Sequence, residues 1–483
     1  MAADRLKNYI AGEWRDSKTT QYLDVLNPTT NRAIAQVPLS TAADVEDAIA
    51  AANDAFNEWR ETPPTMRVQY LFRLKELMEA HFEDVARTIV TENGKTLDEA
   101  RGETRRTIEN IEVATGVTSL MMGRNLEDVA RGIDEEVVRQ PMGAFAVIAP
   151  YNFPAMVPWW FAPYAMATGN TYIVKPSEQA PLTQSAIFDL VHDLDLPPGV
   201  MNLVHGGREV VDVLTKSPGI VGISSVTSTP VAKAIYTAAT GSGKRAQCQA
   251  GAKNFIVVMP DADIEKAIPG LLASCYGCAG QRCLAGAVLV PVGEAYEPLR
   301  DRFVEAAAKI KVGDPLDESA QMGPVISKQH QQRVLRHIEQ GVKDGAKLLL
   351  DGRQVTVPGC EEGYFVGPTV LDGVTPEMAI ARDEIFGPVI GILRVGSLDE
   401  AIEVIDANPY GNASSIFTAS GGAAREFKYR VKCGNIGVNV GVAAPMAFFP
   451  FGGRKDSFFG DLHGQGQDAI DFLTEKKVVI TRW

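Results

Sequence analysis

The sequence has few of the residues that build metal centres or disulfide frameworks. Its 483 residues include six cysteines and six histidines. Six cysteines in so long a chain do not form a disulfide scaffold, so we expect free thiols in a reducing compartment. The pair Cys275-x-x-Cys278, with Cys283 nearby, fits a zinc ligand set, but no histidine lies close to it in sequence. We therefore expect no bound metal.

Positive charge and targeting signals are also scarce. The 47 Lys+Arg against 60 Asp+Glu give a net charge of −13 with no long basic run, which argues against nucleic acid or an anionic membrane as a partner. Residues 1–7 lack the apolar core of a signal peptide, so we expect a cytoplasmic protein. Residues 142–169 are apolar and long enough to cross a bilayer, but four prolines interrupt them, which favours a strand and a buried helix.

What is present is a repeated alternation of strand-like and helix-like segments. Between residues 143 and 258 the predicted strands are 144–148, 171–174, 201–204 and 219–223. The predicted helices between and after them are 155–168, 182–194, 208–216 and 230–241. This order is typical of βαβ units in a doubly wound parallel sheet, which binds ligands at the carboxyl ends of its strands. We expect a nucleotide-like ligand there.

A second α/β pattern starts near Asn254, so the chain should divide into two or three domains. Its predicted elements are a helix over 264–279, a strand over 287–290 and a helix over 297–310. Earlier helices, over 42–59, 65–90 and 96–113, should flank the first sheet. The short strand-like segments 126–138 and 478–483 are set apart from both patterns, and we expect them to pair as edge strands across a subunit interface.

Cys283 is the first candidate for chemistry. The predicted helix ends in Cys278-Ala-Gly-Gln-Arg-Cys283, which places the thiol on a turn before a strand. The adjacent positive charge of Arg282 would lower the pKa of this thiol and make it a nucleophile. A free cysteine is more often a small buried apolar side chain, so this segment alone does not decide its role.

Polar residues end two neighbouring predicted strands. Asn152, in Pro150-Tyr-Asn-Phe-Pro154, carries an amide that can stabilise an oxyanion, or it is a turn residue among prolines. Lys175 and Glu178 follow the next strand and can bind the hydroxyls of an adenosine ribose. An acidic side chain there favours NAD over its 2′-phosphorylated form. The alternative is a solvated loop pair.

Four motifs together resemble the aldehyde dehydrogenase superfamily in order and spacing, over essentially the whole chain. They are Pro150-Tyr-Asn-Phe-Pro154, Lys175-Pro-Ser-Glu178, Gly280-Gln-Arg-Cys283 and Glu384-Ile-Phe-Gly-Pro388. Any one of these motifs is unspecific, whereas four in register are highly specific. The resemblance implies an NAD-dependent enzyme that oxidises an aldehyde through a thioester on a cysteine.

The resemblance also implies a role for each matching residue. Cys283 would be the nucleophile, and Asn152 with the Cys283 backbone amide would form the oxyanion hole. The implied cofactor-binding residues are Lys175 and Glu178 for the adenosine ribose, Ser228 for the pyrophosphate, Glu384 for the nicotinamide ribose, and Phe386 and Phe153 beside the nicotinamide.

Gln249 bears on what accepts the acyl group. Hydrolytic members of the family have Glu-Leu-Gly-Gly-Lys where this chain has Gln249-Ala-Gly-Ala-Lys253, and that glutamate activates water. An amide cannot take up a proton usefully at neutral pH. A thiol such as coenzyme A ionises far more readily than water, so the glutamine favours CoA as the acceptor. Sequence drift, an inactive enzyme or a base supplied by another residue are the alternatives.

The chain most resembles the CoA-acylating methylmalonate and malonate semialdehyde dehydrogenases. The similarity rests on Gly251-Ala-Lys-Asn254, Gly280-Gln-Arg-Cys283 and the segment from Ser457 through Trp483. In that group two arginines bind the substrate carboxylate, here Arg282 and Arg106 by position. Arg106 shares its helix with other arginines, so a solvated side chain is the alternative. A product with a β-carboxylate would lose carbon dioxide to give propionyl-CoA or acetyl-CoA.

Two departures affect the details. Ser225-Val-Thr-Ser228 replaces the common Phe-x-Gly-Ser, so Thr227 puts a side chain where glycine would admit the pyrophosphate. Cys248 and Gln249 also differ from the usual residues of the group. A hydrolytic dehydrogenase acting on another anionic aldehyde, and an inert binding protein with the same fold, therefore stay as competing hypotheses.

The expected architecture is α/β, with a doubly wound parallel-sheet NAD-binding domain, a second α/β catalytic domain and a small β oligomerisation element. We assign residues 1–122 and 142–252 to the first, 253–445 to the second, and 123–141 with 446–483 to the third. A homodimer or homotetramer is expected from the resemblance.

Overall fold

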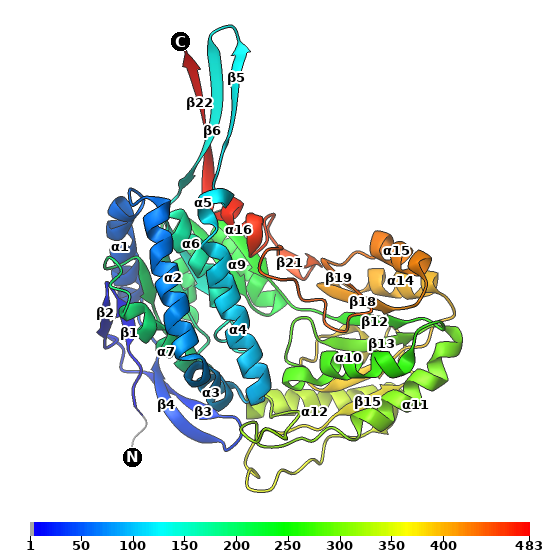
Figure 1. The fold of residues 1–483 in the computed structure, drawn as a ribbon. Helices are drawn as coiled ribbons and strands as arrows, with labels where there is room; N and C mark the ends of the chain where they lie inside the picture. Colours follow the sequence, from blue (N-terminus) through cyan, green and yellow to red (C-terminus); the bar gives the residue numbers. More distant parts are fainter. Residues whose placement is uncertain (1–3) are drawn as a thin grey trace.

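A computed structural model describes residues 4–483. Residues 1–3 lie outside the described residues. They belong to the N-terminal segment in which we expect no targeting signal. Two large sheets with helices on both faces form the body of the protein, and a thin three-stranded ribbon projects from it (Figure 1). None of the helices within residues 4–483 combines the length and the apolar character needed to cross a bilayer.

The first sheet is mostly parallel and matches the predicted doubly wound arrangement. Its strand order is β2-β1-β9-β8-β7-β10-β11-β21, and the five strands from β9 to β11 run parallel. The bounds of its strands are β1 (Asn8–Ile10), β2 (Glu13–Arg15), β7 (Ala144–Ile148), β8 (Thr171–Lys175), β9 (Met201–Leu203), β10 (Gly222–Val226), β11 (Arg245–Gln249) and β21 (Phe458–Phe459).

Strand β7 shows why helices cover both faces of this sheet. Its side chains alternate between two apolar clusters, because successive residues of a strand point to opposite faces. Phe145 and Val147 belong to one cluster, and Ala144, Ala146 and Ile148 to the other. The first cluster is covered by α2 (Pro64–Ala80), α3 (Phe82–Asn93), α4 (Leu97–Ala114), α6 (Ala162–Thr168) and α7 (Leu182–His192). The second is covered by α1 (Ala42–Trp59), α8 (Arg208–Lys216) and α9 (Thr229–Gly241).

The second sheet has the order β14-β15-β16-β13-β12-β18-β19, parallel apart from the pairing of β14 with β15. Its strands are β12 (Asn254–Val258), β13 (Gly286–Pro291), β14 (Lys347–Leu350), β15 (Thr369–Asp372), β16 (Val389–Ile392), β18 (Ala413–Phe417) and β19 (Asn435–Val438). Its helices are α10 (Ile264–Tyr276), α11 (Tyr296–Ala307), α12 (Lys328–Lys343), α13 (Ala379–Arg382), α14 (Leu398–Ala407) and α15 (Gly421–Arg430). The predicted mixed α/β fold class is thus confirmed.

The projecting ribbon contains the segments predicted to form edge strands. Strand β22 (Thr474–Arg482) pairs antiparallel with β6 (Ile133–Pro141) along its whole length, and β6 pairs with β5 (Arg124–Ala130). The two segments therefore pair with each other inside one chain. Smaller elements are the hairpin β3 (Tyr22–Asn27) with β4 (Arg32–Pro38), β17 (Tyr410–Gly411) with β20 (Arg454–Lys455), α5 (Val117–Leu120) and α16 (Gly466–Leu473).

Several predicted boundaries were wrong. The single helix over 65–90 is two helices, α2 and α3, because His81 leaves the helical conformation with φ −105° and ψ 22°. The helix over 155–168 is a short 3₁₀ turn at Pro158–Trp160 followed by α6, in a proline-rich segment. The strand over 219–223 is β10, which starts later, at Gly222. The helix over 264–279 ends at Tyr276.

Candidate active site

A cavity of about 930 Å³ lies at the carboxyl ends of the strands of the first sheet, between it and the second sheet. This is the place where an open α/β sheet binds ligands. Seven of the ten predicted site residues line it: Asn152, Lys175, Glu178, Ser228, Cys283, Glu384 and Phe386. The other three, Phe153, Arg106 and Arg282, do not line it.

The Cys283 turn has an unusual backbone that brings the thiol to the cavity. After α10 the chain takes left-handed conformations at Cys278 and Ala279, each with φ +52°. Gly280 follows with φ +73°, and a Cβ there would lie 2.3 Å from the Gly387 carbonyl oxygen, so only glycine fits. The sequence interpretation of a continuous helix up to residue 279 missed this distortion.

Two asparagine amides fix the backbone of Cys283. Asn254 Nδ2 and Asn412 Nδ2 donate to the Cys283 carbonyl oxygen at 2.9 and 2.7 Å. Asn254 starts β12, and Asn412 immediately precedes β18, two neighbouring strands of the second sheet. The sequence analysis did not identify either residue as part of the site, because their contacts to Cys283 span long stretches of chain.

The pKa of Cys283 departs from the expectation. Burial raises the pKa of this thiol to about 12, and the negative charge of Glu384 adds to the increase. The charge of Arg282 lowers the pKa, as predicted, but it is outweighed. In the protein without ligands the thiol is therefore largely protonated at neutral pH, and the predicted activation by Arg282 alone was wrong.

Asn152 lies beside the thiol in the cavity lining. Its side chain is buried, and Nδ2 donates one hydrogen bond to the Gln281 carbonyl oxygen at 3.0 Å. An amide nitrogen carries two hydrogens, so the second is available to an oxygen on a carbon bonded to Cys283. The arrangement suits an oxyanion hole.

Lys175 and Glu178 form a pair at the end of β8. Lys175 Nζ lies 3.1 Å from Glu178 Oε2, with the lysine buried and the glutamate about a third exposed. Burial lowers the pKa of Lys175, and the nearby carboxylate opposes that change. The pair offers one cationic donor and one anionic acceptor to vicinal hydroxyl groups, as the sequence predicts for a ribose.

The N-terminus of α9 opens on the cavity. Ser228 is the N-cap residue, and its side chain makes no capping hydrogen bond. The free N–H groups of the first turn and the helix dipole favour an anion at this point. Thr227 also lines the cavity, and its hydroxyl lies 3.5 Å from the Ser228 backbone carbonyl oxygen.

Glu384 and Phe386 lie across the cavity from these groups, on a loop before β16. Glu384 Oε1 accepts a hydrogen bond from the Ala252 backbone N–H at 2.8 Å, and burial raises the pKa of Glu384 to about 6. Phe386 has φ +61°, and its carbonyl oxygen lies 2.7 Å from His330 Nε2. The ring of Tyr151 stands perpendicular to the Phe386 ring at 6.1 Å between centroids.

Gln249, at the end of β11, is buried near the site. Its Nε2 donates to the Phe451 carbonyl oxygen at 2.9 Å, while Oε1 is without a hydrogen-bond partner among residues 4–483. This amide cannot act as a general base. No three His, Cys, Asp or Glu side chains in the described part of the chain gather to hold a metal ion.

The predicted residues outside the cavity have other contacts. Arg106 Nη1 is 3.0 Å from Glu109 Oε2 and 2.6 Å from Met446 Sδ. Arg282 donates to the Ala273 carbonyl oxygen and borders a much smaller cavity. The ring of Phe153 lies under Lys95 Nζ, 4.0 Å from it.

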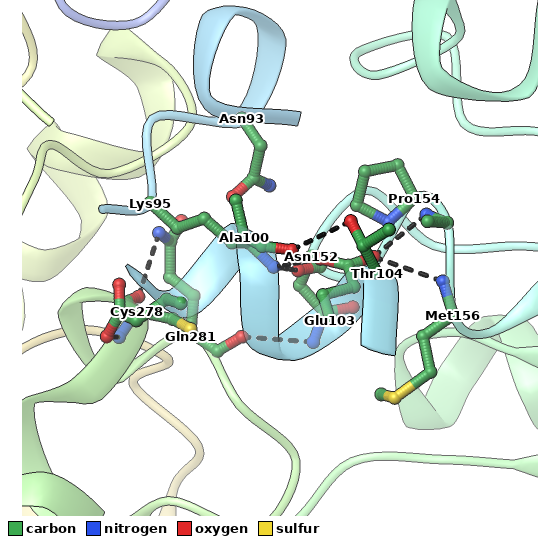
Figure 2. A network of polar contacts seen from close by, with 12 residues as sticks. Asn93, Lys95, Ala100, Glu103, Thr104, Asn152, Pro154, Met156, Cys278 and Gln281 are labelled. Atoms are coloured by element: carbon green, nitrogen blue, oxygen red, sulfur yellow. Dashed lines mark hydrogen bonds and ion pairs between the residues drawn. The ribbon is translucent and has the colours of Figure 1, made fainter. Parts of the chain in front are cut away.

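A buried polar network lies directly behind Asn152 (Figure 2). Lys95 and Glu103 form an ion pair at 2.5 Å, and Lys95 Nζ also donates to the Asn152 carbonyl oxygen at 2.8 Å. The sequence analysis missed these residues. The charged helix over 96–113 was expected to flank the first sheet, and no sequence pattern indicates that one of its charged residues, Glu103, is buried.

Comparison with known proteins identifies close relatives. The model of the aldehyde dehydrogenase family matches residues 14–479. Malonate-semialdehyde dehydrogenase 1 of Geobacillus thermodenitrificans is 47% identical over 479 residues, which cover 99% of each chain.

Solved structures are similarly close. Methylmalonate-semialdehyde dehydrogenase from Oceanimonas doudoroffii superposes with a TM-score of 0.98 at 43% identity, covering 99% of this chain and 98% of that one. A Sinorhizobium meliloti protein assigned as a methylmalonate-semialdehyde dehydrogenase, in complex with NAD, gives a TM-score of 0.98 at 38% identity, covering 100% and 98%.

Proposed function

Because the chain belongs to the aldehyde dehydrogenase family, we propose that it oxidises a carboxylated aldehyde of the malonate or methylmalonate semialdehyde type, with NAD as oxidant and coenzyme A as acyl acceptor. The observation that carries this proposal is one cavity that joins the Cys283 thiol and the Asn152 amide to the polar groups at the strand ends. Its full-length relatives are malonate- and methylmalonate-semialdehyde dehydrogenases.

Cys283 and Asn152 carry the bond-forming step. The Cys283 thiolate attacks the aldehyde carbon, and the carbonyl electron pair moves to the oxygen. The free N–H of Asn152 and the Cys283 backbone N–H donate to that oxygen and stabilise the thiohemiacetal. Loss of hydride from the same carbon leaves a thioester on Cys283.

The cavity suits NAD in size and in its polar groups. Lys175 and Glu178 would hold the adenosine ribose, Ser228 and the α9 N-terminus the pyrophosphate, and Glu384 the nicotinamide ribose. Phe386 and Phe153 would pack beside the nicotinamide. When bound, NAD would supply the hydride acceptor, and its positive charge would favour the thiolate form of Cys283.

Gln249 supports a thiol as acyl acceptor. The buried amide of Gln249 cannot remove a proton from water. A thiol has a pKa of about 8.5, far below that of water, so its thiolate can attack the thioester without a protein base. Transfer to coenzyme A then releases Cys283. If the acyl group carries a β-carboxylate, loss of carbon dioxide gives acetyl-CoA or propionyl-CoA.

Arg282 and Arg106 would bind the substrate carboxylate. Arg282 is adjacent to the nucleophile in sequence, and its Nε is buried without a partner among residues 4–483. Arg106 lies on α4, beside Met446 and Glu109. Two guanidinium groups would bind a carboxylate through paired hydrogen bonds and disfavour neutral aldehydes.

The proposed organisation assigns each part of the chain a task. Residues 1–122 and 142–252 would form the NAD-binding domain, and 253–445 the catalytic domain. Residues 123–141 and 446–483 would mediate assembly into a homodimer or homotetramer. The six cysteines are all thiols, which is consistent with a reducing, cytoplasmic location.

The deciding experiment measures NADH formation by purified protein with NAD and malonate or methylmalonate semialdehyde, with and without CoA. Multiple turnovers that require CoA support the proposal. Multiple turnovers without CoA would establish a hydrolytic dehydrogenase, and no turnover of any aldehyde would establish an inert binding protein. Replacing Cys283 with serine should abolish NADH formation, and retained activity would refute the thioester mechanism.

Carboxylate recognition is tested by Arg282→Ala. We expect kcat/KM for malonate semialdehyde to fall about 100-fold or more, because a desolvated carboxylate loses a bidentate partner, while propanal oxidation falls far less. The control is Arg105→Ala, which removes an arginine paired with Glu79 on the outer surface of α4. Equal losses with both aldehydes would remove Arg282 from carboxylate recognition.

A further inference from the structure

Lys95 and Glu103 form a fully buried ion pair outside the large cavity. Both side chains have 0% exposure, and the Nζ to Oε2 distance is 2.5 Å. Neither residue lines the cavity. Taking two charges out of water is costly, and a buried ion pair is weak evidence for stability. Stability alone therefore does not explain why this pair is buried and hydrogen-bonded to the backbone.

These hydrogen bonds converge on the segment that carries Asn152. Lys95 Nζ donates to the Asn152 carbonyl oxygen at 2.8 Å, and Glu103 Oε1 accepts from the backbone N–H groups of Ala155 and Met156 at 2.8 and 3.1 Å. Figure 2 shows the pair between α4 and this segment. The backbone is thus held at the Asn152 carbonyl group and again at residues 155 and 156.

Neighbouring residues extend the same contact. Asn93 Nδ2 donates to the Tyr151 carbonyl oxygen at 2.8 Å. Gln184 Nε2 donates to the Pro154 carbonyl oxygen at 2.6 Å. Four side chains, from three helices and from the loop between α3 and α4, therefore fix the backbone between residues 151 and 156, a stretch that has no regular secondary structure.

Helix α4 also holds the loop that carries Cys283. Glu99, in its first turn, accepts a hydrogen bond from the Cys278 backbone N–H at 2.5 Å. The Gln281 carbonyl in that loop accepts from Asn152 Nδ2. The nucleophile loop and the segment that carries Asn152 are thus both attached to α4, by Glu99 and Glu103, which lie about one turn apart.

We propose that Lys95 and Glu103 are positioning residues that set the distance between the Asn152 amide and the substrate oxygen on Cys283. Neither lines the cavity: Lys95 acts through the Asn152 carbonyl group, and Glu103 acts through the backbone N–H groups of Ala155 and Met156. This inference rests on the proposed function, because it assumes that Asn152 donates to an oxyanion. A displacement of about 1 Å at such a donor can cost about 100-fold in rate.

The test measures the first half-reaction in Lys95→Met and in Asn152→Ala, alone and combined. We expect Lys95→Met to slow single-turnover NADH formation about 10- to 100-fold, with KM for NAD within about twofold. In the Asn152→Ala background the same change should cost less than about threefold, because coupled residues are not additive. An equal loss in both backgrounds, or no loss in either, would overturn the proposal.

Two further variants control for charge and folding. Lys75→Met removes a lysine paired with Glu112 across α2 and α4 at 3.0 Å on the surface, and it should leave the rate unchanged. Lys95→Met leaves the Glu103 carboxylate buried without its partner. The double variant Lys95→Met/Glu103→Gln removes both charges, and the amide oxygen at position 103 can still accept from the backbone N–H groups of residues 155 and 156. It should fold and still react slowly. A folded double variant with the full rate would refute the role of Lys95.

A second substrate tests the positioning role of Lys95 independently of which aldehyde the protein oxidises. The release of p-nitrophenol from p-nitrophenyl acetate by Cys283 needs the thiol and the oxyanion donors, but neither NAD nor CoA. Lys95→Met should slow this acylation as much as it slows aldehyde oxidation, while iodoacetamide should alkylate Cys283 at an unchanged rate. If the wild type oxidises no semialdehyde but the ester reaction still depends on Lys95, the proposed substrate fails and the positioning role stands.

Discussion

At the scale of the residue, the pKa of the Cys283 thiol differs from the lowered value that its sequence neighbours predict. Arg282 is one residue away and lowers the pKa of the thiol, but burial dominates and Glu384 adds to it, so that the pKa is raised to about 12. A raised pKa means that the thiolate fraction at pH 7 is small and still grows above pH 9. We therefore expect slow alkylation of the ligand-free protein at neutral pH.

This gives a prediction about pH dependence. The rate of Cys283 alkylation by iodoacetamide in the ligand-free protein should keep rising beyond pH 9, where a free thiol with a pKa of about 8.5 levels off. Glu384→Gln removes a negative charge that raises the pKa, so alkylation at pH 8 should become roughly threefold faster. Peptide mass spectrometry at Cys283 measures the rate.

The matched control for that charge change is Glu178→Gln. It removes a carboxylate from the same cavity that is not among the groups acting on the Cys283 pKa. Alkylation should not change in this variant. If both variants, or neither, accelerate the reaction, the influence of Glu384 on the thiol is not specific.

At the scale of the element, the N-terminus of α9 is a prepared anion site. Ser228 caps the helix by position, yet its hydroxyl makes no capping bond and faces the cavity. Thr229 Oγ1, next along the chain, accepts from the Gly251 backbone N–H at 2.9 Å and so ties the helix start to the residues after β11. The Ser228 hydroxyl makes no capping bond, and in the proposed function it contacts a ligand phosphate.

Ser228→Ala should therefore weaken NAD binding about tenfold, the effect expected for loss of a hydrogen bond to a charged group. The value of kcat at saturating NAD should change little. Titration of protein fluorescence with NAD measures the dissociation constant. Ser242→Ala, at the far end of the same helix, removes a hydroxyl bonded to the Ala238 carbonyl and should leave affinity unchanged. A similar effect of both variants would point to helix stability instead.

The elements also show what the sequence can and cannot determine. Strands such as β7 and β8 were predictable because a short apolar run between turn residues is typical of a buried strand in an α/β chain. The break at His81 was not, since no glycine or proline marks it. The strand near residue 220 was placed too early because Gly219 and Ile220 precede β10 with the same apolar character.

At the scale of the whole molecule, the site divides into a predictable part and an unpredictable one. Residues that face the ligand come from motifs at strand ends, and these can be recognised along the chain. The residues that hold them in place cannot, because Lys95 contacts Asn152 across 57 positions and Glu99 contacts Cys278 across 179. A charged residue on an amphipathic helix is usually solvated, so its burial becomes evident only in three dimensions.

Assembly is the other property at this scale. The ribbon of β5, β6 and β22 projects from the body, and its outer strands β5 and β22 have no further strand partner among residues 4–483 (Figure 1). It carries exposed apolar side chains at Leu126, Val478 and Ile480, 64%, 59% and 66% exposed. Open strand edges and apolar patches invite pairing with another chain. A second copy of this protein is the partner that we propose for these strand edges.

The double variant Val478→Lys/Ile480→Lys should therefore reduce the mass measured by light scattering to that of a smaller assembly. Two adjacent lysines on one face of β22 place like charges in an apolar contact, where each would lose hydration without gaining a partner. Because these positions are exposed in the single chain, the protomer itself should stay folded by circular dichroism. The control, Leu316→Lys/Val342→Lys, adds the same charges at exposed apolar positions far along the chain from the ribbon. An unchanged mass in the ribbon variant, or an equal loss in the control, would place the subunit interface elsewhere.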